Sequence, residues 1–185
     1  MALTKTPVCD FGKKAEDFKL KSIENKLISL NDVKGDKATL IMFICNHCPY
    51  VKAIIRDLAK DCNELKKDGI NTVAIMSNDT KNYPEDSYEN MIKFAKTNNF
   101  GEINYLIDET QEIARKYGAV CTPDFFGYNK ELKLQYRGRF RELKDLKPVS
   151  GGDSDLKIAM KMISETQAGP KKQVPSMGCN IKWFN

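Results

Sequence analysis

The amino-acid sequence predicts an α/β fold in which helices cover both faces of a β-sheet. Between residues 38 and 107, apolar stretches of strand-like composition alternate with stretches of helical periodicity, an order typical of a mostly parallel sheet. Two further segments, at residues 18–30 and 125–136, have the pattern of β-hairpins and add a strand pair before and after this alternation.

The first half of the chain follows a regular order of strand and helix signals. Residues 18–21 and 26–30 alternate apolar and polar side chains, and they form the first predicted hairpin. Residues 38–44 are almost all apolar, as expected of a central strand that is covered on both faces. Over residues 51–65, apolar side chains recur at three- and four-residue steps, which predicts a helix that ends before Gly69.

Residues 1–185 contain no linker, repeat or low-complexity tract, so we expect a single domain. Its last part, residues 169–185, is rich in Pro, Gly and Lys, and it predicts an irregular C-terminal extension. The remaining predicted elements are a strand at 70–76, a helix after residues 83–87, a strand at 104–107, a brief helix that ends at Gly118, the second hairpin, and a final helix from Asp153 or Ser154 to Ile163.

Composition and charge argue against two classes of partner. The 185 residues include 30 Lys and Arg against 25 Asp and Glu, and these charges are scattered along the chain. A nucleic-acid binder clusters its basic residues on one face, so we expect no nucleic-acid partner. No apolar stretch is long enough to span a bilayer, and the first residues lack the apolar core of a secretory signal. We therefore expect a cytoplasmic protein without a membrane partner, in which structural disulfides are disfavoured.

The chemistry of the chain is predicted from Cys45-Asn46-His47-Cys48, which lies between the buried strand and the long helix. Two cysteines at this spacing can close a small disulfide ring, and the N-terminus of a helix lowers the pKa of a nearby thiol. We expect Cys45 to attack as the thiolate and Cys48 to resolve the mixed disulfide.

His47 is the only histidine, and it lies inside this ring. An imidazolium there would stabilise the Cys45 thiolate, and the alternative is an exposed histidine without effect on either sulfur. A C-x-x-C pair can also be half of a zinc site, but zinc needs about four ligands. No second cysteine pair or histidine accompanies the motif, so we expect no bound metal.

The order of strand, C-x-x-C, helix and a distant Thr122-Pro123 resembles the thioredoxin fold. This resemblance implies a central mixed β-sheet flanked by helices, with an N-terminal β-hairpin and a C-terminal extension. It also implies that Pro123 is a cis-proline beside the active-site cysteines, with Thr122 and Asp124 as supporting residues. Four segments are more narrowly similar to the peroxiredoxin-like 1 family of AhpC/TSA proteins: Cys45–Val51, Tyr83–Ser87, Cys121–Phe126 and Pro175–Trp183.

Two departures from the family patterns bear on the reaction. Peroxiredoxins have a Thr three residues before the peroxidatic cysteine, and with Cys48 in that place the position is Cys45. Thioredoxins have a buried Asp six residues before the first cysteine, and here that position is Thr39. Another group must then accept the proton of the resolving thiol, and Asp124 is our candidate, with a structural turn or strand-end role as the alternative.

The other cysteines divide into candidates and bystanders. Cys121 lies two residues before Pro123, and Cys179 lies in the Gly-flanked tail, so each is a possible resolving thiol or a buried packing residue. Cys62 falls on the apolar stripe of the long helix, and Cys9 lies in the N-terminal arm, where we expect no catalytic role. Asn78, Asp79 and Tyr83 follow a strand whose carboxyl end we expect to border the cysteine turn, and the alternative for these polar residues is an ordinary capping or turn role.

Three functions fit these observations. The leading one is a thiol–disulfide oxidoreductase that cycles Cys45 and Cys48, with a redox-active disulfide and no other cofactor. The second is a thiol peroxidase with Cys121 or Cys179 as the resolving thiol. The third is a non-catalytic redox sensor or metal-thiolate module. The partners expected for either enzyme are a disulfide or peroxide substrate and an external thiol reductant, and the sequence does not indicate the oligomeric state.

Overall fold

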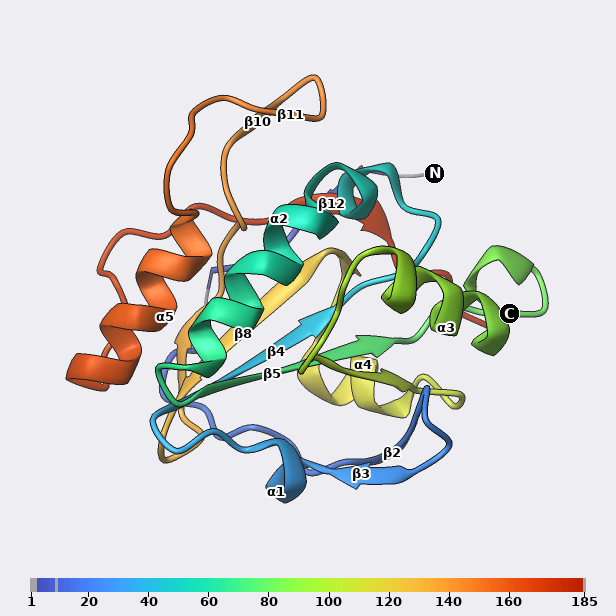
Figure 1. The fold of residues 1–185 in the computed structure, drawn as a ribbon, viewed down its shortest axis with the longest axis horizontal. Coiled ribbons are helices and arrows are strands. Elements are labelled where there is room, and N and C mark those ends of the chain that lie inside the picture. Colours follow the sequence, from blue (N-terminus) through green and yellow to red (C-terminus); the bar gives the residue numbers. More distant parts are fainter. Residues whose placement is uncertain (1–2, 9, 185) are drawn as a thin grey trace.

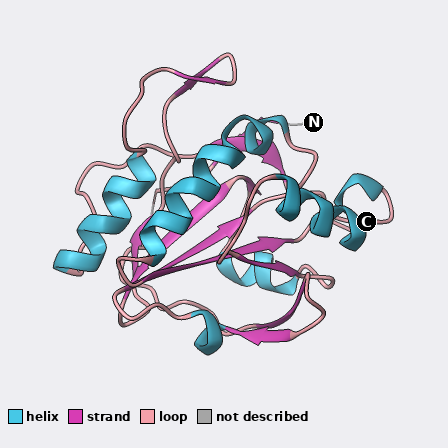
Figure 2. Cartoon of the chain, viewed as in Figure 1, coloured by secondary structure: helices cyan, strands magenta, loops and turns pink. Residues whose placement is uncertain are grey.

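The computed structural model describes residues 3–8 and 10–184, and its centre is a seven-stranded sheet (Figures 1 and 2). The strand order is β3-β2-β6-β5-β4-β8-β9. The strands are β2 (Lys19–Ser22), β3 (Leu27–Ser29), β4 (Ala38–Phe43), β5 (Ile70–Met76), β6 (Asn104–Ile107), β8 (Asp124–Asn129) and β9 (Leu134–Tyr136).

Only the two central pairings, β4 with β5 and β5 with β6, are parallel. The other four pairings are antiparallel, because the first hairpin joins β6 at one edge and the second hairpin joins β4 at the other. The sheet is therefore mixed, as the family resemblance implied. The alternation of strands and helices alone predicted a mostly parallel sheet. This expectation is wrong because the strands of both hairpins join the same sheet in antiparallel orientation.

Helices cover both faces of the sheet. Three of them, α2 (Pro49–Lys66), α3 (Tyr88–Thr97) and α5 (Asp155–Thr166), lie on the face turned toward the viewer in Figure 1. The short helices α1 (Leu30–Val33) and α4 (Glu112–Tyr117) pack on the opposite face. Between α2 and α3 the chain also forms a 3-10 turn, η1 (Pro84–Asp86).

Strand β4 divides the hydrophobic core because its side chains alternate between the two faces. Leu40 and Met42 pack on the side of α2, α3 and α5, whereas Ile41 and Phe43 pack on the side of α1 and α4. All six residues of β4 are buried, as its apolar composition predicted. The end of this strand is therefore fixed from both faces, which places Cys45 at a rigid point of the molecule.

Helix α2 starts where the sequence favours a start. Pro49 occupies the first turn, where its missing N–H costs no hydrogen bond, and Cys48 is the N-cap residue. The predicted apolar stripe, which includes Val51, Leu58 and Cys62, is buried against the sheet. This packing fixes the direction of the helix axis and thereby the position of Cys48.

The C-terminal extension is not irregular throughout. Strand β12 (Met177–Asn180) lies between β1 (Leu3–Lys5) and β7 (Cys121–Thr122) in a separate three-stranded antiparallel sheet. Four residues that include Gly178 give no strand signal in the sequence. The glycine is required by the close approach of two backbones, because a Cβ at this position would collide with the Thr122 carbonyl.

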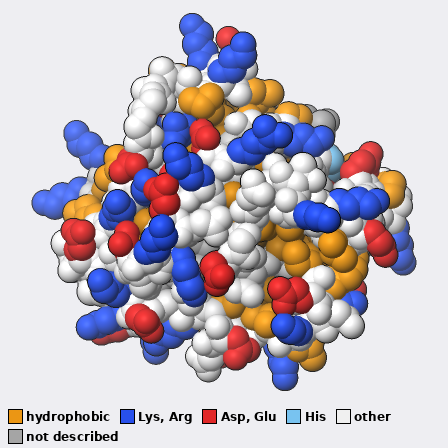
Figure 3. Space-filling model, in the orientation of Figure 1, with side chains coloured by type: hydrophobic (Ala, Val, Ile, Leu, Met, Phe, Trp, Pro, Cys, Tyr) orange, Lys and Arg blue, Asp and Glu red, His pale blue; other side chains and the backbone are white. Residues whose placement is uncertain are grey.

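A second small feature outside the main sheet is the hairpin of β10 (Leu143–Lys144) and β11 (Lys147–Pro148), which projects from the body of the molecule (Figure 1). On the face shown in Figure 3, basic and acidic side chains are interspersed. None of the helices in the described part of the chain has the length and apolar character needed to cross a membrane.

Candidate active site

Two thiols of the C-x-x-C motif face the segment that precedes β8. Cys45 follows β4 and Cys48 caps α2, and their exposed fractions are only 1% and 0%. The peptide bond between Thr122 and Pro123 is cis, as the family resemblance implied. The Thr122 hydroxyl lies 3.3 Å from the Cys45 sulfur, and its carbonyl accepts a hydrogen bond from the Cys48 thiol at 3.1 Å. Thr122 therefore contacts both sulfurs.

A third thiol meets this pair from the C-terminal strand. The sulfur of Cys179 lies 3.0 Å from the sulfur of Cys48, although the two residues are 131 positions apart in sequence. In the register of the small sheet, Cys179 stands opposite Thr122. Of the two cysteines predicted as possible resolving thiols, Cys179 is thus the one that the structure brings to the motif.

The surroundings of the two motif thiols differ in their effect on ionisation. Hydrogen bonds from Cys45 and then Cys179, together with the backbone N–H of Val51, lower the pKa of Cys48 to about 5 against the opposing effect of burial. The pKa of Cys45 is raised well above its ordinary value by its hydrogen bond to Cys48, by burial and by the charge of Asp86. This order of pKa values is the reverse of the one expected from the sequence, because Cys48 accepts hydrogen bonds from the other two thiols whereas burial and Asp86 disfavour the Cys45 thiolate.

The imidazole of His47 is paired with a carboxylate that the sequence analysis did not single out. Its Nδ1 lies 2.7 Å from an oxygen of the fully buried Asp86, and its ring stacks on Tyr83. The hydrogen bond to Asp86 raises the pKa of His47, although burial opposes it. Asp86 thus holds the imidazole beside the motif, and the expected effect of His47 on the Cys45 thiolate stays a prediction.

Asp86 also holds the turn that carries the motif. Its carboxylate accepts hydrogen bonds from the backbone N–H groups of Asn46 (2.8 Å) and His47 (3.3 Å) and from the side chain of Asn78 (2.8 Å). Asn78 and Tyr83 thus border the cysteine turn, as expected. Asp79 instead accepts hydrogen bonds from the backbone N–H groups of residues 81 and 82 and from the side chain of Asn82.

One group of potential metal ligands lies within this site. A nitrogen of His47, an oxygen of Asp86 and the sulfur of Cys45 lie within 4.8 Å of one another. The Asp86 carboxylate, however, already accepts hydrogen bonds from Asn46, His47 and Asn78, and a carboxylate offers about four acceptor positions. A metal would have to displace these donors, so the hydrogen-bond network accounts for the cluster without an ion.

Asp124 is held away from the thiols. Along β8 its side chain falls on the same face as Phe126, and the guanidinium of Arg137 lies between them, 3.1 Å from the Asp124 carboxylate and over the Phe126 ring. The motif cysteines belong to the core on the opposite face. Burial raises the pKa of Asp124 to about 6, although Arg137 lowers it. The expected role as proton acceptor for Cys48 is replaced by an ion pair that anchors the cis-proline segment.

The two other cysteines in the described part of the chain, Cys62 and Cys121, lie outside the three-thiol cluster. Cys121 is fully buried, burial raises its pKa, and its thiol donates a hydrogen bond to the Pro123 carbonyl. Cys62 lies in the core stripe of α2, as predicted, and burial raises its pKa to about 12. Cys9 lies outside the described residues.

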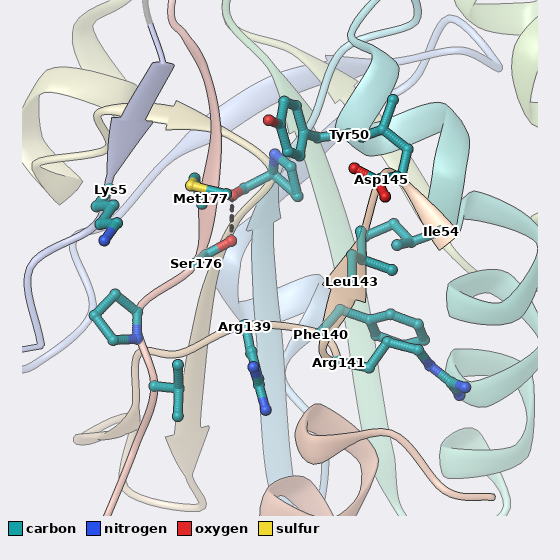
Figure 4. Close-up of a pocket in the computed structure, with 14 residues that line it drawn as sticks. Lys5, Tyr50, Ile54, Arg139, Phe140, Arg141, Leu143, Asp145, Ser176 and Met177 are labelled. Atoms are coloured by element: carbon teal, nitrogen blue, oxygen red, sulfur yellow. Dashed lines mark hydrogen bonds between the residues drawn. The ribbon is translucent and has the colours of Figure 1, made fainter. Parts of the chain in front are cut away.

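A cavity of about 410 Å³ adjoins the cluster. Tyr50 and Ile54 of α2 lie on one side of it, and Lys5 and Met177 lie on the other (Figure 4). Pro123 also lines it, next to the residue that contacts both motif sulfurs. The other lining residues come from the loop after β9, from the projecting hairpin and from the segment before β12: Arg139, Phe140, Arg141, Leu143, Asp145, Leu146, Val174, Pro175 and Ser176.

The family model of the AhpC/TSA family matches residues 11–139, a range that includes the strand, the motif and the cis-proline. The chain belongs to the AhpC/TSA family. Two solved structures match it over nearly its whole length. An uncharacterized conserved protein from Geobacillus kaustophilus is 40% identical, with a TM-score of 0.94 and with 100% of this chain and 97% of that chain covered. A hypothetical protein from Sinorhizobium meliloti is 38% identical, with a TM-score of 0.90 and 98% of each chain covered.

More distant structures confirm the thioredoxin-like fold of this AhpC/TSA protein. The thioredoxin domain of a thiol-disulfide oxidoreductase from Bacteroides vulgatus is 20% identical, with a TM-score of 0.58 over 69% of this chain and 86% of that chain. Among curated proteins, none matches the chain. Family and fold together support a redox function.

Proposed function

We propose that this AhpC/TSA protein is a thiol–disulfide oxidoreductase in which Cys48 attacks the substrate and Cys45 resolves the mixed disulfide. The observation that carries the proposal is the place of Cys48, which caps α2 and, like Cys45, has its sulfur against Thr122 of the cis-proline segment. Its lowered pKa keeps it ionised near neutral pH, and the thiolate is the nucleophilic form. The hydrogen bond from the Cys48 thiol to the Thr122 carbonyl is given up when the thiol ionises.

Each step balances. The Cys48 thiolate attacks one sulfur of a substrate disulfide, a mixed disulfide forms, and the other substrate sulfur leaves as a thiolate. Cys45 then attacks the Cys48 sulfur, the Cys45–Cys48 bond forms, and the second substrate sulfur leaves. The proton of Cys45 passes to a departing substrate thiolate. An external thiol reductant returns the pair to the reduced state, so the redox-active disulfide is the only redox group needed.

The cavity beside Pro123 is the proposed substrate site. It adjoins Tyr50, two residues after Cys48, and its apolar wall includes Ile54 and Met177. A volume of about 410 Å³ lies in the range of ordinary ligand sites, which hold roughly 300–1,000 Å³. Because both motif sulfurs are buried, the turn must open locally when a disulfide bound there reaches Cys48.

Single serine variants distinguish the order of attack. We expect Cys48→Ser to abolish disulfide reduction, and Cys45→Ser to accumulate a mixed disulfide between Cys48 and the substrate. Cys62→Ser is the matched control, because Cys62 lies on the same helix but outside the cluster. If Cys45→Ser abolishes the first step and Cys48→Ser traps substrate, the roles are those expected from the sequence. If neither variant affects turnover, the two-cysteine cycle is wrong.

Thiol peroxidase activity is the second candidate. It is favoured by family membership and by the place of Cys48 at the start of α2, where the resemblance puts a peroxidatic cysteine. Peroxide would convert Cys48 to a sulfenic acid, which can condense with a neighbouring thiol and release water. Stoichiometric hydrogen peroxide should then consume the thiol in a stopped-flow assay much faster than it consumes free cysteine. A rate no faster than that of free cysteine would exclude this candidate.

A further inference from the structure

Cys48 has thiol neighbours from two different segments, and the proposed cycle uses only one of them. Cys45 precedes it in the same turn, whereas Cys179 comes from β12 and places its sulfur 3.0 Å from that of Cys48. Two sulfurs at this separation need little movement to bond, because a disulfide requires about 2.05 Å. Cys48 can form only one such bond at a time, so the two neighbours compete for it.

The position of Cys179 is fixed by the surroundings of β12 on both sides. Before the strand, the Ser176 hydroxyl donates a hydrogen bond to the Pro123 carbonyl at 2.8 Å. After the strand, the backbone N–H of Lys182 donates to the side chain of Asn78 at 2.9 Å, and its carbonyl accepts from the Gln111 side chain at 2.7 Å. The strand itself pairs with both β1 and β7. The approach of the two sulfurs is therefore built into the fold.

We propose that Cys179 is a third redox-active thiol, which exchanges into the Cys45–Cys48 disulfide and leaves a Cys48–Cys179 disulfide that joins α2 to β12. This inference rests on the proposed oxidoreductase function and extends it. The Cys179 sulfur attacks the Cys48 sulfur, the bond from Cys48 to Cys45 breaks, and the Cys179 proton passes to Cys45. No electrons are gained or lost in this step, because the substrate disulfide has already oxidised the pair.

Cys45 and Cys179 exchange places as neutral thiols. Burial raises the pKa of both, so the proton that Cys179 gives up is taken by the Cys45 sulfur. Cys179 is also the most exposed of the three thiols at 5%, and Ser176 and Met177 of the same segment line the cavity. The exchange thus moves the disulfide from the motif turn to β12, whose first residue, Met177, lines the cavity together with Ser176.

Disulfide mapping tests the exchange directly. Cys45 and Cys48 lie in one tryptic peptide, residues 38–52, and Cys179 lies in another, residues 173–182. The reduced protein is treated with a small disulfide, quenched with acid and digested, and the peptides are identified by mass. We expect the oxidised wild type to yield peptide 38–52 cross-linked to peptide 173–182. Cys62→Ser, the control, should yield the same cross-link.

Serine variants identify the sulfurs and separate this inference from the proposed function. The cross-link should persist in Cys45→Ser and disappear in Cys48→Ser, and in Cys179→Ser the disulfide should remain within peptide 38–52. An internal disulfide in wild type, with no cross-link there or in Cys45→Ser, overturns the inference and leaves the oxidoreductase cycle intact. A cross-link that survives in Cys48→Ser also overturns it. Failure of Cys179→Ser to form the internal disulfide instead contradicts the proposed function.

Discussion

The buried ion pair of Asp124 and Arg137 allows a prediction with a clear pH signature. Arg137→Met removes the guanidinium that lies 3.1 Å from the Asp124 carboxylate and keeps an unbranched apolar side chain in its place. The native pKa of Asp124 is about 6, against an ordinary value of 3.8. A nearby opposite charge lowers the pKa of a carboxyl by about 1–3, so the variant should raise it to roughly 7–9.

The raised pKa of Asp124 makes the loss of stability in the variant depend on pH. A carboxyl whose native pKa lies above its unfolded pKa costs stability when it is ionised, and this cost falls as the pH drops below the native pKa and is gone below the unfolded pKa. One pKa unit corresponds to about 1.4 kcal/mol, so the variant should lose roughly 1.4–4 kcal/mol at about pH 9 for this reason. At about pH 5 the carboxyl is mostly protonated with or without Arg137, and this part of the loss vanishes.

A second part of the loss does not depend on pH. Arg137 also donates a hydrogen bond to the Gly118 carbonyl at 2.7 Å and lies over the Phe126 ring. These contacts contribute about 1–2 kcal/mol together. The free energy of unfolding should therefore fall by about 1–2 kcal/mol at about pH 5 and by roughly 2–6 kcal/mol at about pH 9, when both contributions are added.

Urea unfolding followed by circular dichroism at both pH values measures this difference. Arg139→Met is the matched control, because the side chains of Arg139 and its partner Asp155 are 26% and 44% exposed. We expect a small and similar loss at both pH values for the control. Adding Asp124→Asn to Arg137→Met should remove the pH-dependent part. Equal losses for Arg137→Met at both pH values would refute the reasoning.

Three further predictions concern the site. In His47→Gln, we expect the free energy of unfolding to fall by about 1 kcal/mol below about pH 6 and by less at high pH. The reason is that the pKa of His47 is raised in the folded protein, so the protonated imidazole stabilises the fold at low pH and this stabilisation is lost as the pH rises through the native pKa. A loss that does not depend on pH would contradict this prediction. In Thr122→Val, the Cys45 thiol loses its hydroxyl contact, so resolution of the mixed disulfide should slow by about fivefold in single-turnover assays; an unchanged rate would exclude this role. In Ile54→Trp, the larger side chain should fill the cavity and slow reduction of a protein disulfide by about tenfold or more, while a small disulfide reacts as before. Ile92→Trp, on the exposed surface of α3, is the control. If Ile54→Trp reduces the protein disulfide as fast as the wild type does, the cavity has no part in substrate binding.

Much of the fold could be predicted because its central elements carry strong local signals. The apolar residues 38–44 and the helical stripe from Val51 to Leu65 needed no tertiary information. Several shorter elements were not predicted, because their formation depends on local capping or on a neighbouring strand. Leu30 was expected to end a strand, but it begins α1 because Ser29 and Asp32 form a capping box. Strands of two to four residues, such as β12, form only because a neighbouring strand is present.

The candidate site was predictable to the extent that its residues are adjacent in sequence. The spacing of Cys45 and Cys48 identified the motif, and the resemblance placed Thr122. Asp86, by contrast, looks like an ordinary acidic residue in a turn, and its role depends on a contact across 39 positions. The sequence singles out Asp124 but not its ion-pair partner Arg137, 13 positions away. Without that partner, Asp124 is predicted to be a proton acceptor and not half of a buried ion pair.

The arrangement of β12 has a consequence for the order in which the molecule becomes reactive. Cys179 is synthesised 131 residues after Cys48, and the strand that carries it lies between two segments that are made earlier. While the chain grows, the motif cysteines have each other but lack the third sulfur. The third sulfur therefore reaches Cys48 only after β12 has been made and has entered the gap between β1 and β7.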